Sequence, residues 1–288
     1  MPNEYLRYVD ERTERAIAAG SLQPIVTEQT ELVDGGLRFL VRSVSTLAGK
    51  GASFPGGPRD PNFNPFLSPE PALDLGPIGD RHTAILNKFP VSTRHVVLAT
   101  QGFREQLEPL DRSDFAALAR LLVESGGLGF YNGGAPAGAS QRHKHVQWIP
   151  EMPGNATLRE WLPGLPPDAQ PLHTATHPQL TARHCFVRVD CALGLAVDRA
   201  AAGLHEAFGR ALERLRMQPD DDGLLPPFNL LVADGWMLLV PRSREHFEEV
   251  SINALAFGGT FFVRDPAKIE AIRSAGPLRV LSEVGCSS

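Results

Sequence analysis

Residues 131–150 read YNGGAPAGASQRHKHVQWIP, and near the end of this stretch two histidines and a glutamine occupy every second position. A β-strand turns successive side chains to opposite faces, so residues spaced by two share a face. The spacing therefore predicts a strand in an antiparallel sheet that presents three polar side chains together. The polar set is His143, His145 and Gln147, and the opposite set is Lys144, Val146 and Trp148.

Glycines are dense just before this strand, at positions 126, 127, 129, 133, 134 and 138. Glycine lets backbone N–H groups approach an anion closely, and it adopts the left-handed conformations that an anion-binding nest needs. A pair of imidazoles beside such a phosphate cradle indicates phosphoryl or nucleotidyl transfer through a histidine.

A bare His-x-His pattern also fits a half-exposed strand or two ligands of a metal ion. The three cysteines, Cys185, Cys191 and Cys286, lack the close spacing of a zinc site. The glycine-rich approach, the Ser140-Gln141 pair before the histidines and Gln147 after them favour catalysis, and we expect no metal ligands in the chain.

The motifs NGG at 132–134, GASQ at 138–141 and HKHVQ at 143–147 resemble the signature of the ATP adenylyltransferases, also called diadenosine tetraphosphate phosphorylases. This family belongs to the histidine-triad superfamily and is related to galactose-1-phosphate uridylyltransferase. Further segments resemble the family in the same order along the chain. They are VR at 41–42 with STLAGK at 45–50, NPF at 64–66, LNKF at 86–89 with His95, and the runs 228–242 and 253–260.

The resemblance implies that His145 is the nucleophile and that His143 fixes the orientation of the site. His145 would attack an α-phosphate of diadenosine tetraphosphate, expel ATP and carry AMP, and inorganic phosphate would then release ADP. Lys50 matches a phosphate-contacting lysine of the family. The expected substrate-binding residues are Lys50, Asn87, Lys88, Asn132, Gly133, Gly138, Ser140 and Gln141.

Gln147 discriminates between phosphorolysis and hydrolysis. Histidine-triad hydrolases place a third histidine at the equivalent position, where an imidazole can move protons. An amide can only form hydrogen bonds, so attacking water lacks a proton acceptor there, whereas phosphate is already anionic. The open alternatives are a dinucleoside polyphosphate hydrolase, another nucleotidyltransferase of the superfamily, or a non-catalytic nucleotide sensor. The uridylyltransferase has proline between and after its histidines, where this chain has Lys144 and Val146.

The chain has 288 residues, a net charge of −5 and a pI near 6.0, which argue against a nucleic-acid-binding surface. No apolar stretch is long enough to span a bilayer, and the three scattered cysteines favour a reducing cytoplasm. We expect Mg²⁺ to arrive with the substrate phosphates. The sequence does not determine the oligomeric state.

The element pattern predicts an α+β fold with an antiparallel sheet and flanking helices in two similar halves. The family resemblance implies that the sheet is histidine-triad-like, as in galactose-1-phosphate uridylyltransferase relatives. Residues 1–175 would form the catalytic half, and 176–288 would complete the same unit. We expect an N-terminal helix with Leu6, Val9, Ala16 and Ile17 near one face and Gly20 as its stop. We also expect a loop from 49 to 79, hairpins at 82–100 and 228–241, and helices at 200–215 and 111–126, the latter capped by Asp111 or Ser113 and ended by Gly126-Gly127. Arg242 and Arg244 would lie at the surface or mouth. The histidines expected to be structural or solvated are His82, His95, His173, His177, His184, His205 and His246.

Overall fold

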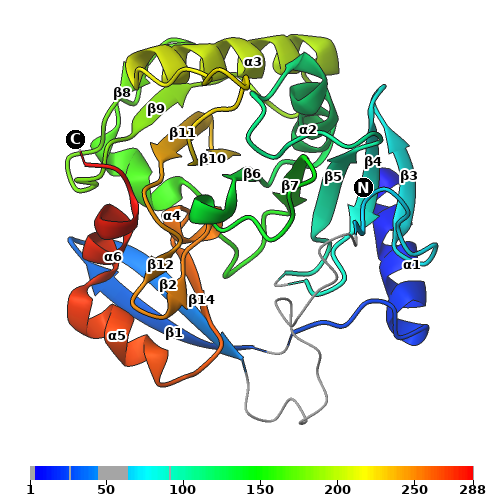
Figure 1. The fold of residues 1–288 in the computed structure, drawn as a ribbon, viewed down its shortest axis with the longest axis horizontal. Coiled ribbons are helices and arrows are strands. Elements are labelled where there is room, and N and C mark those ends of the chain that lie inside the picture. Colours follow the sequence, from blue (N-terminus) through cyan, green and yellow to red (C-terminus); the bar gives the residue numbers. More distant parts are fainter. Residues whose placement is uncertain (1–3, 26, 45–63, 91, 288) are drawn as a thin grey trace.

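An antiparallel sheet of nine strands forms the centre of the fold (Figure 1). The computed structural model describes residues 4–25, 27–44, 64–90 and 92–287. The strand order is β3-β4-β5-β7-β6-β10-β11-β9-β8. The strands are β3 (Asp74–Ile78), β4 (His82–Leu86), β5 (Val96–Thr100), β6 (Leu128–Gly133), β7 (His145–Ile149), β8 (Thr174–Ala175), β9 (Cys185–Arg188), β10 (Phe228–Ala233) and β11 (Trp236–Pro241).

Eight of the nine strands form the same unit twice, in agreement with the two similar halves predicted from the sequence, and β3 adds an edge strand beside β4. Each unit is a strand pair, a helix and a second strand pair. The first unit runs β4, β5, α2 (Arg112–Ser125), β6 and β7, and the second runs β8, β9, α3 (Val197–Arg214), β10 and β11. The units meet where β6 pairs antiparallel with β10. Hydrogen bonds therefore continue from one half of the sheet to the other. The division of the chain into two halves at residue 175 stays a prediction.

The strand register shows which residues correspond between the two halves. In the first half His145 lies opposite Ala99 and Gln147 lies opposite Val97. In the second half the corresponding pairs are Trp236 with Arg188 and Leu238 with Phe186. The second half therefore replaces the polar pair of β7 by Trp236 and Leu238, and it presents an apolar strand there.

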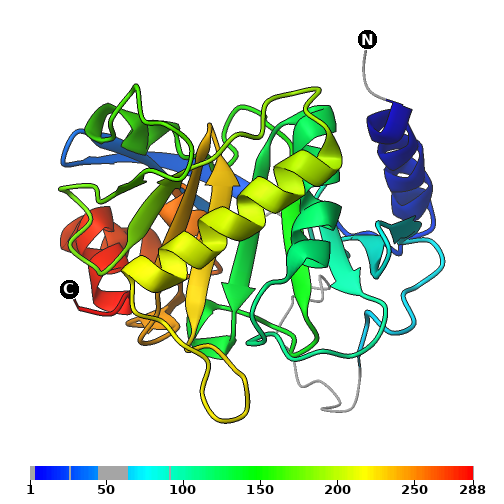
Figure 2. The ribbon, with the colours of Figure 1, turned by 90° about the horizontal axis from the view of Figure 1, so that it is seen from above.

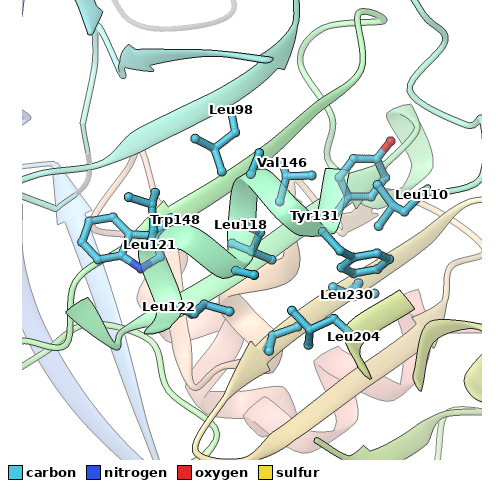
Figure 3. Packing of buried hydrophobic residues seen from close by; sticks show 14 of the residues in the cluster. Leu98, Leu110, Leu118, Leu121, Leu122, Tyr131, Val146, Trp148, Leu204 and Leu230 are labelled. Carbon is cyan, nitrogen blue, oxygen red and sulfur yellow. The ribbon is translucent and has the colours of Figure 1, made fainter. Parts of the chain in front are cut away.

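Helices α2 and α3 cover one face of the sheet (Figure 2). Leu118, Leu121 and Leu122 of α2 pack toward the sheet residues Val146 and Trp148 (Figure 3). Each buried leucine of this kind contributes about 1.5–3 kcal/mol relative to exposure. The ends of α2 follow the sequence prediction: the Asp111 carboxylate accepts N–H bonds as N-cap, and Gly126 ends the helix.

A second layer packs on the opposite face, mainly against the second half. Its apolar core joins Phe186, Leu231 and Leu238 of the large sheet to Phe39 and Phe261. In this layer β14 runs parallel to β2. Its elements are β1 (Thr27–Asp34), β2 (Leu37–Val44), β14 (Thr260–Val263), α4 (Ala254–Phe257), α5 (Lys268–Ala275) and α6 (Pro277–Val284). In the first half the same sheet face forms a wall of a cavity instead.

Two local predictions need correction. The segment 49–79 was predicted to be a loop, but it contains strand β3. This strand forms because Leu75 and Ile78 pack into the core beside β4. Ile17 in α1 (Glu4–Ala18) is 46% exposed, whereas Val9 and Ala16 form the buried face of that helix. The remaining short elements are the 3₁₀ helices η1 (Ala135–Ala137) and η2 (Arg159–Gly164) and the strands β12 (His246–Phe247) and β13 (Val250–Ser251).

Within residues 4–25, 27–44, 64–90 and 92–287, none of the helices combines the length and apolar character that a membrane crossing requires.

Candidate active site

Strand β7 presents His145 and Gln147 to a cavity of about 1160 Å³. The intervening residues turn the other way, and Val146 and Trp148 join the core beneath α2, as the alternation predicts. Lys144 also faces α2, where its ammonium lies 2.6 Å from Asp114 Oδ2. Polar groups for chemistry and core groups for stability therefore share one short strand.

The His145 ring is held in a single tautomer. Its Nδ1–H donates to the backbone carbonyl of His143 at 2.7 Å, so the proton is on Nδ1 and Nε2 keeps its lone pair. Burial lowers the pKa of His145 from 6.5 to about 4, and the ring is neutral at physiological pH. A neutral imidazole with a free Nε2 beside an open cavity is equipped to act as a nucleophile.

Gln106, a residue that the sequence did not single out, holds the backbone of His145. Its Oε1 accepts the His145 N–H at 2.8 Å, and its Nε2 donates to the Asn132 carbonyl at 2.8 Å. The β6–β7 pairing stops at Phe130 and Gln147, and the buried Gln106 amide continues the hydrogen bonding beyond that point. Distance in sequence explains the omission, because nothing near residue 106 indicates that it reaches β7.

The His143 ring is directed to Thr100 and Asn64. Its Nε2 lies 2.7 Å from the Thr100 carbonyl, and its Nδ1 lies 2.9 Å from Asn64 Nδ2. The Asn64 Oδ1 accepts the Phe66 N–H at 3.0 Å, and the Phe66 ring centroid lies 4.9 Å from that of His145. His143 thus orients His145 through its backbone carbonyl, while its ring fastens the segment that lies against the nucleophile.

His95, which was expected to be structural or solvated, is buried and contacts Gln147. It directly precedes β5, lines the cavity, and has its Nε2 2.9 Å from Gln147 Oε1. Burial lowers the pKa of His95 from 6.5 to about 4. The contact arises because β5 and β7 are neighbours in the sheet, which the spacing of the histidines does not reveal.

The glycine-rich approach contributes in different ways. Gly138 lines the cavity at φ +86°, where a Cβ would lie 2.8 Å from the Cβ of Asn253, so the close approach of the two segments requires glycine. Gly133 instead packs against β10, since a Cβ there would lie 2.9 Å from the Phe228 ring. Ser140 and Gln141 line the cavity together with Gly138.

Asn132 also lines the cavity, at the end of β6. Its Oδ1 accepts hydrogen bonds from Asn229 Nδ2 and from the Ala254 N–H, both at 2.9 Å. With the oxygen engaged in this way, the amide nitrogen is the group that Asn132 can offer to a ligand as a donor.

Two of the three remaining residues expected to bind substrate line the cavity. Asn87 and Lys88 follow β4 and line the cavity, where Lys88 forms an ion pair with Glu70. Lys50 lies outside the described residues.

The opposite wall carries charges that the sequence analysis missed. Arg42, Arg264 and Lys268 line the cavity, and Lys268 pairs with Glu249. The described lining residues include as many carboxylates as cationic groups; the carboxylates are Glu70, Glu245, Glu249 and Asp265, and the cations are Arg42, Lys88, Arg264 and Lys268. Their wide separation in the sequence hides this arrangement.

Arg242 was predicted at the surface or mouth, and the structure contradicts this. It is 3% exposed, and burial lowers its pKa to about 10. Its guanidinium donates to the Val284 carbonyl at 3.0 Å and to the Ile252 carbonyl at 2.9 Å. Arg242 therefore ties the end of α6 to the loop before α4.

Across the described part of the chain, no group of three or more histidine, cysteine, aspartate or glutamate side chains is placed to hold a metal ion.

Fold and site together define a class: a twofold-repeated α+β protein in which one half presents a neutral imidazole with a free Nε2 to a large cavity with charged residues on its walls. The family model described as "Ap4A phosphorylase N-terminal domain" matches residues 1–160, and the one described as "ATP adenylyltransferase C-terminal domain" matches residues 178–287. The chain belongs to this family of Ap4A (diadenosine tetraphosphate) phosphorylases.

Two curated yeast proteins are similar over most of the chain. Diadenosine 5′,5‴-P1,P4-tetraphosphate phosphorylase 2 of Saccharomyces cerevisiae is 28% identical over 72% of this chain and 70% of its own length. Protein APA1 of the same organism is 24% identical over 92% of this chain and 88% of its own length. The structure of yeast Ap4A phosphorylase Apa2 in complex with AMP superposes with a TM-score of 0.78 at 22% identity, covering 100% of this chain and 99% of that one. At this identity the superposition establishes the fold.

Proposed function

We propose that this protein is an ATP adenylyltransferase that phosphorolyses diadenosine tetraphosphate to ATP and ADP through an adenylyl group carried on His145. The observation that carries the proposal is the Nδ1–H bond of His145 to the His143 carbonyl, which leaves Nε2 as the attacking atom. The family membership and the name of the 28% identical relative, a diadenosine tetraphosphate phosphorylase, support the choice of substrate.

Two displacements at phosphorus make up the reaction. First, His145 Nε2 forms a bond to the α-phosphorus, the bond from this phosphorus to the bridging oxygen breaks, and ATP leaves with the electron pair. An oxygen of inorganic phosphate then attacks the same phosphorus, the N–P bond breaks, and ADP leaves while His145 regains its lone pair. Both leaving groups depart without needing a strong acid, because a phosphate oxyanion and a neutral imidazole are stable at neutral pH.

Neutral donors stabilise the charge that develops on the phosphoryl oxygens. Asn132 offers its amide nitrogen, Gln147 lies on the same strand face as His145, and Ser140 and Gln141 lie beside them. Gln147 also favours phosphate over water, because an amide accepts no proton from an attacking water molecule, whereas phosphate is already an anion.

A divalent cation accompanies the substrate in this proposal. The carboxylates of the cavity wall equal its cations in number within the described residues, and two of those cations, Lys88 and Lys268, are already paired. A tetraphosphate therefore needs additional positive charge. Mg²⁺ bound through substrate phosphates and waters supplies it without a dedicated protein cage, and Lys50 is the further cation expected from the family resemblance.

We place the protein in the cytoplasm. Its cysteines, Cys185, Cys191 and Cys286, are free thiols, and such thiols persist in a reducing compartment.

Incubation with diadenosine tetraphosphate and Mg²⁺, with and without inorganic phosphate, tests the function. Nucleotide products are separated by anion-exchange chromatography. We expect equimolar ATP and ADP that form only when phosphate is present. Production of AMP and ATP at the same rate without phosphate would identify a hydrolase, and tight binding of diadenosine tetraphosphate without any turnover would identify a nucleotide sensor.

A further inference from the structure

We propose that Asn87 and His95 form a polarised hydrogen-bond chain that holds the Gln147 side chain with its amide nitrogen, rather than its oxygen, turned to the cavity. Asn87 and His95 are positioning residues in this proposal, and Gln147 is the group that meets the phosphoryl oxygens. The role of the oriented amide in catalysis rests on the proposed function, whereas the direction of the chain does not.

The direction of the chain is set at its start by a backbone group. The Phe89 N–H can only donate, and it donates to Asn87 Oδ1 at 3.0 Å. The other end of the Asn87 amide, Nδ2, must then be the donor toward the His95 ring. It lies 3.1 Å from Nδ1, nearer than to Nε2 at 3.4 Å. The Asn87 N–H also donates to the His95 carbonyl at 2.9 Å, so the two residues are held together by their backbones.

The His95 ring transmits this polarity. Because Nδ1 accepts, a neutral ring carries its proton on Nε2. That Nε2–H points at Gln147 Oε1, 2.9 Å away. The ring is 4% exposed, and burial lowers its pKa to about 4. His95 therefore stays neutral near pH 7 and donates in one direction only.

The final member of the chain is left with a single orientation. With Oε1 engaged by His95, the Gln147 side chain, which lines the cavity together with His145, has its Nε2 hydrogens left to offer to a ligand. Two amide hydrogens there stabilise negative charge on a phosphoryl oxygen. The flipped amide would set an oxygen against those oxygens, and it would also lose its bond to His95. The chain thus removes the non-productive rotamer before substrate arrives.

The second half of the sheet provides an internal comparison. His184 directly precedes β9 as His95 directly precedes β5. Its Nδ1 lies 2.7 Å from the Ala182 carbonyl, and its Nε2 accepts the His177 N–H at 2.8 Å. Both bonds are to nearby backbone groups, and the strand residue that corresponds to Gln147 is the apolar Leu238. A side-chain relay therefore exists where there is an amide to orient, and the equivalent histidine serves the backbone where there is none.

A double-mutant cycle measures whether His95 acts through Gln147. We expect His95→Ala to lower kcat for phosphorolysis on the order of 10–100-fold with KM within about threefold, a smaller loss than removal of a transition-state donor outright. The combined variant with Gln147→Ala should be no slower than Gln147→Ala alone. The matched control is His184→Ala, which should lower the melting temperature and leave kcat unchanged. Losses of kcat that multiply in the combined variant would overturn the inference.

Tautomer assignment by ¹⁵N NMR of the histidine-labelled wild-type protein tests the chain independently of activity and of the folding of any variant. We expect His95 to carry its proton on Nε2, and His145 and His184 to carry theirs on Nδ1. A His95 ring protonated on Nδ1 would overturn the inference even in an active enzyme. Conversely, the expected tautomers in a protein without turnover would uphold the chain and refute the proposed function.

Discussion

Replacing Lys144 by methionine should strongly destabilise the protein, although the residue contacts no substrate in our proposal. The Lys144 side chain is fully buried, its Nζ lies 2.6 Å from Asp114 Oδ2, and it donates to the Pro109 carbonyl at 2.8 Å. Methionine fills most of the volume but leaves the Asp114 carboxylate, which is 1% exposed, without its cation. Breaking a buried ion pair from one side costs about 3–5 kcal/mol, a large share of the roughly 5–15 kcal/mol that stabilises a domain.

Urea unfolding followed by circular dichroism measures this cost. The double variant Lys144→Met with Asp114→Asn removes the uncompensated charge, and we expect it to recover at least about 2 kcal/mol relative to Lys144→Met. Arg120→Met is the matched control on the exposed side of α2, where the pair with Glu124 is solvated, and it should change the free energy of unfolding by less than about 1 kcal/mol. A loss below about 1 kcal/mol for Lys144→Met, or a double variant as unstable as the sum of the single ones, would refute the reasoning.

Three further outcomes are expected. His145→Ala should lower the rate by at least about three orders of magnitude while nucleotide still binds, and a rate within about tenfold of wild type would exclude His145 as nucleophile. Gln147→His should raise the ratio of AMP to ADP formed at fixed phosphate, since histidine adds proton transfer at that position; an unchanged ratio in a folded variant would show that access of water controls the choice. Burial lowers the pKa of His95 and of His145 from 6.5 to about 4, so each binds its proton less readily in the folded state than in the unfolded chain. The contribution of these two histidines to stability should therefore be fully present above about pH 6.5. The free energy of unfolding should fall as the pH drops toward 4, by up to about 3 kcal/mol for each histidine. A urea midpoint that rises on acidification would contradict this assignment.

Local sequence patterns predicted the features that depend on neighbouring residues, and they failed where pairing with a distant strand decides the conformation. The alternation in HKHVQW predicted which side chains of this strand share a face, because a strand has a fixed period of two. The helix at 111–126 and the hairpin at 228–241 followed from local rules in the same way, and the structure selects Asp111 over Ser113 as the N-cap. By contrast, β3 was predicted to be a loop, since its Gly76 and Pro77 carry no local strand signal and its pairing with β4 decides its conformation.

The sequence by itself determined the α+β class, the repeated strand-pair unit and the strand face that carries His145 and Gln147. These properties depend on hydrophobic periodicity and on short motifs, which are local. Only the tertiary structure decided that His95 reaches Gln147, that Gln106 holds the backbone of His145 and that Arg242 is buried. His95 and Gln147 are 52 residues apart, Gln106 and His145 are 39 apart, and Arg242 and Val284 are 42 apart. Their partners are set by strand order and sheet register, and neither the spacing nor the type of the residues encodes those pairings.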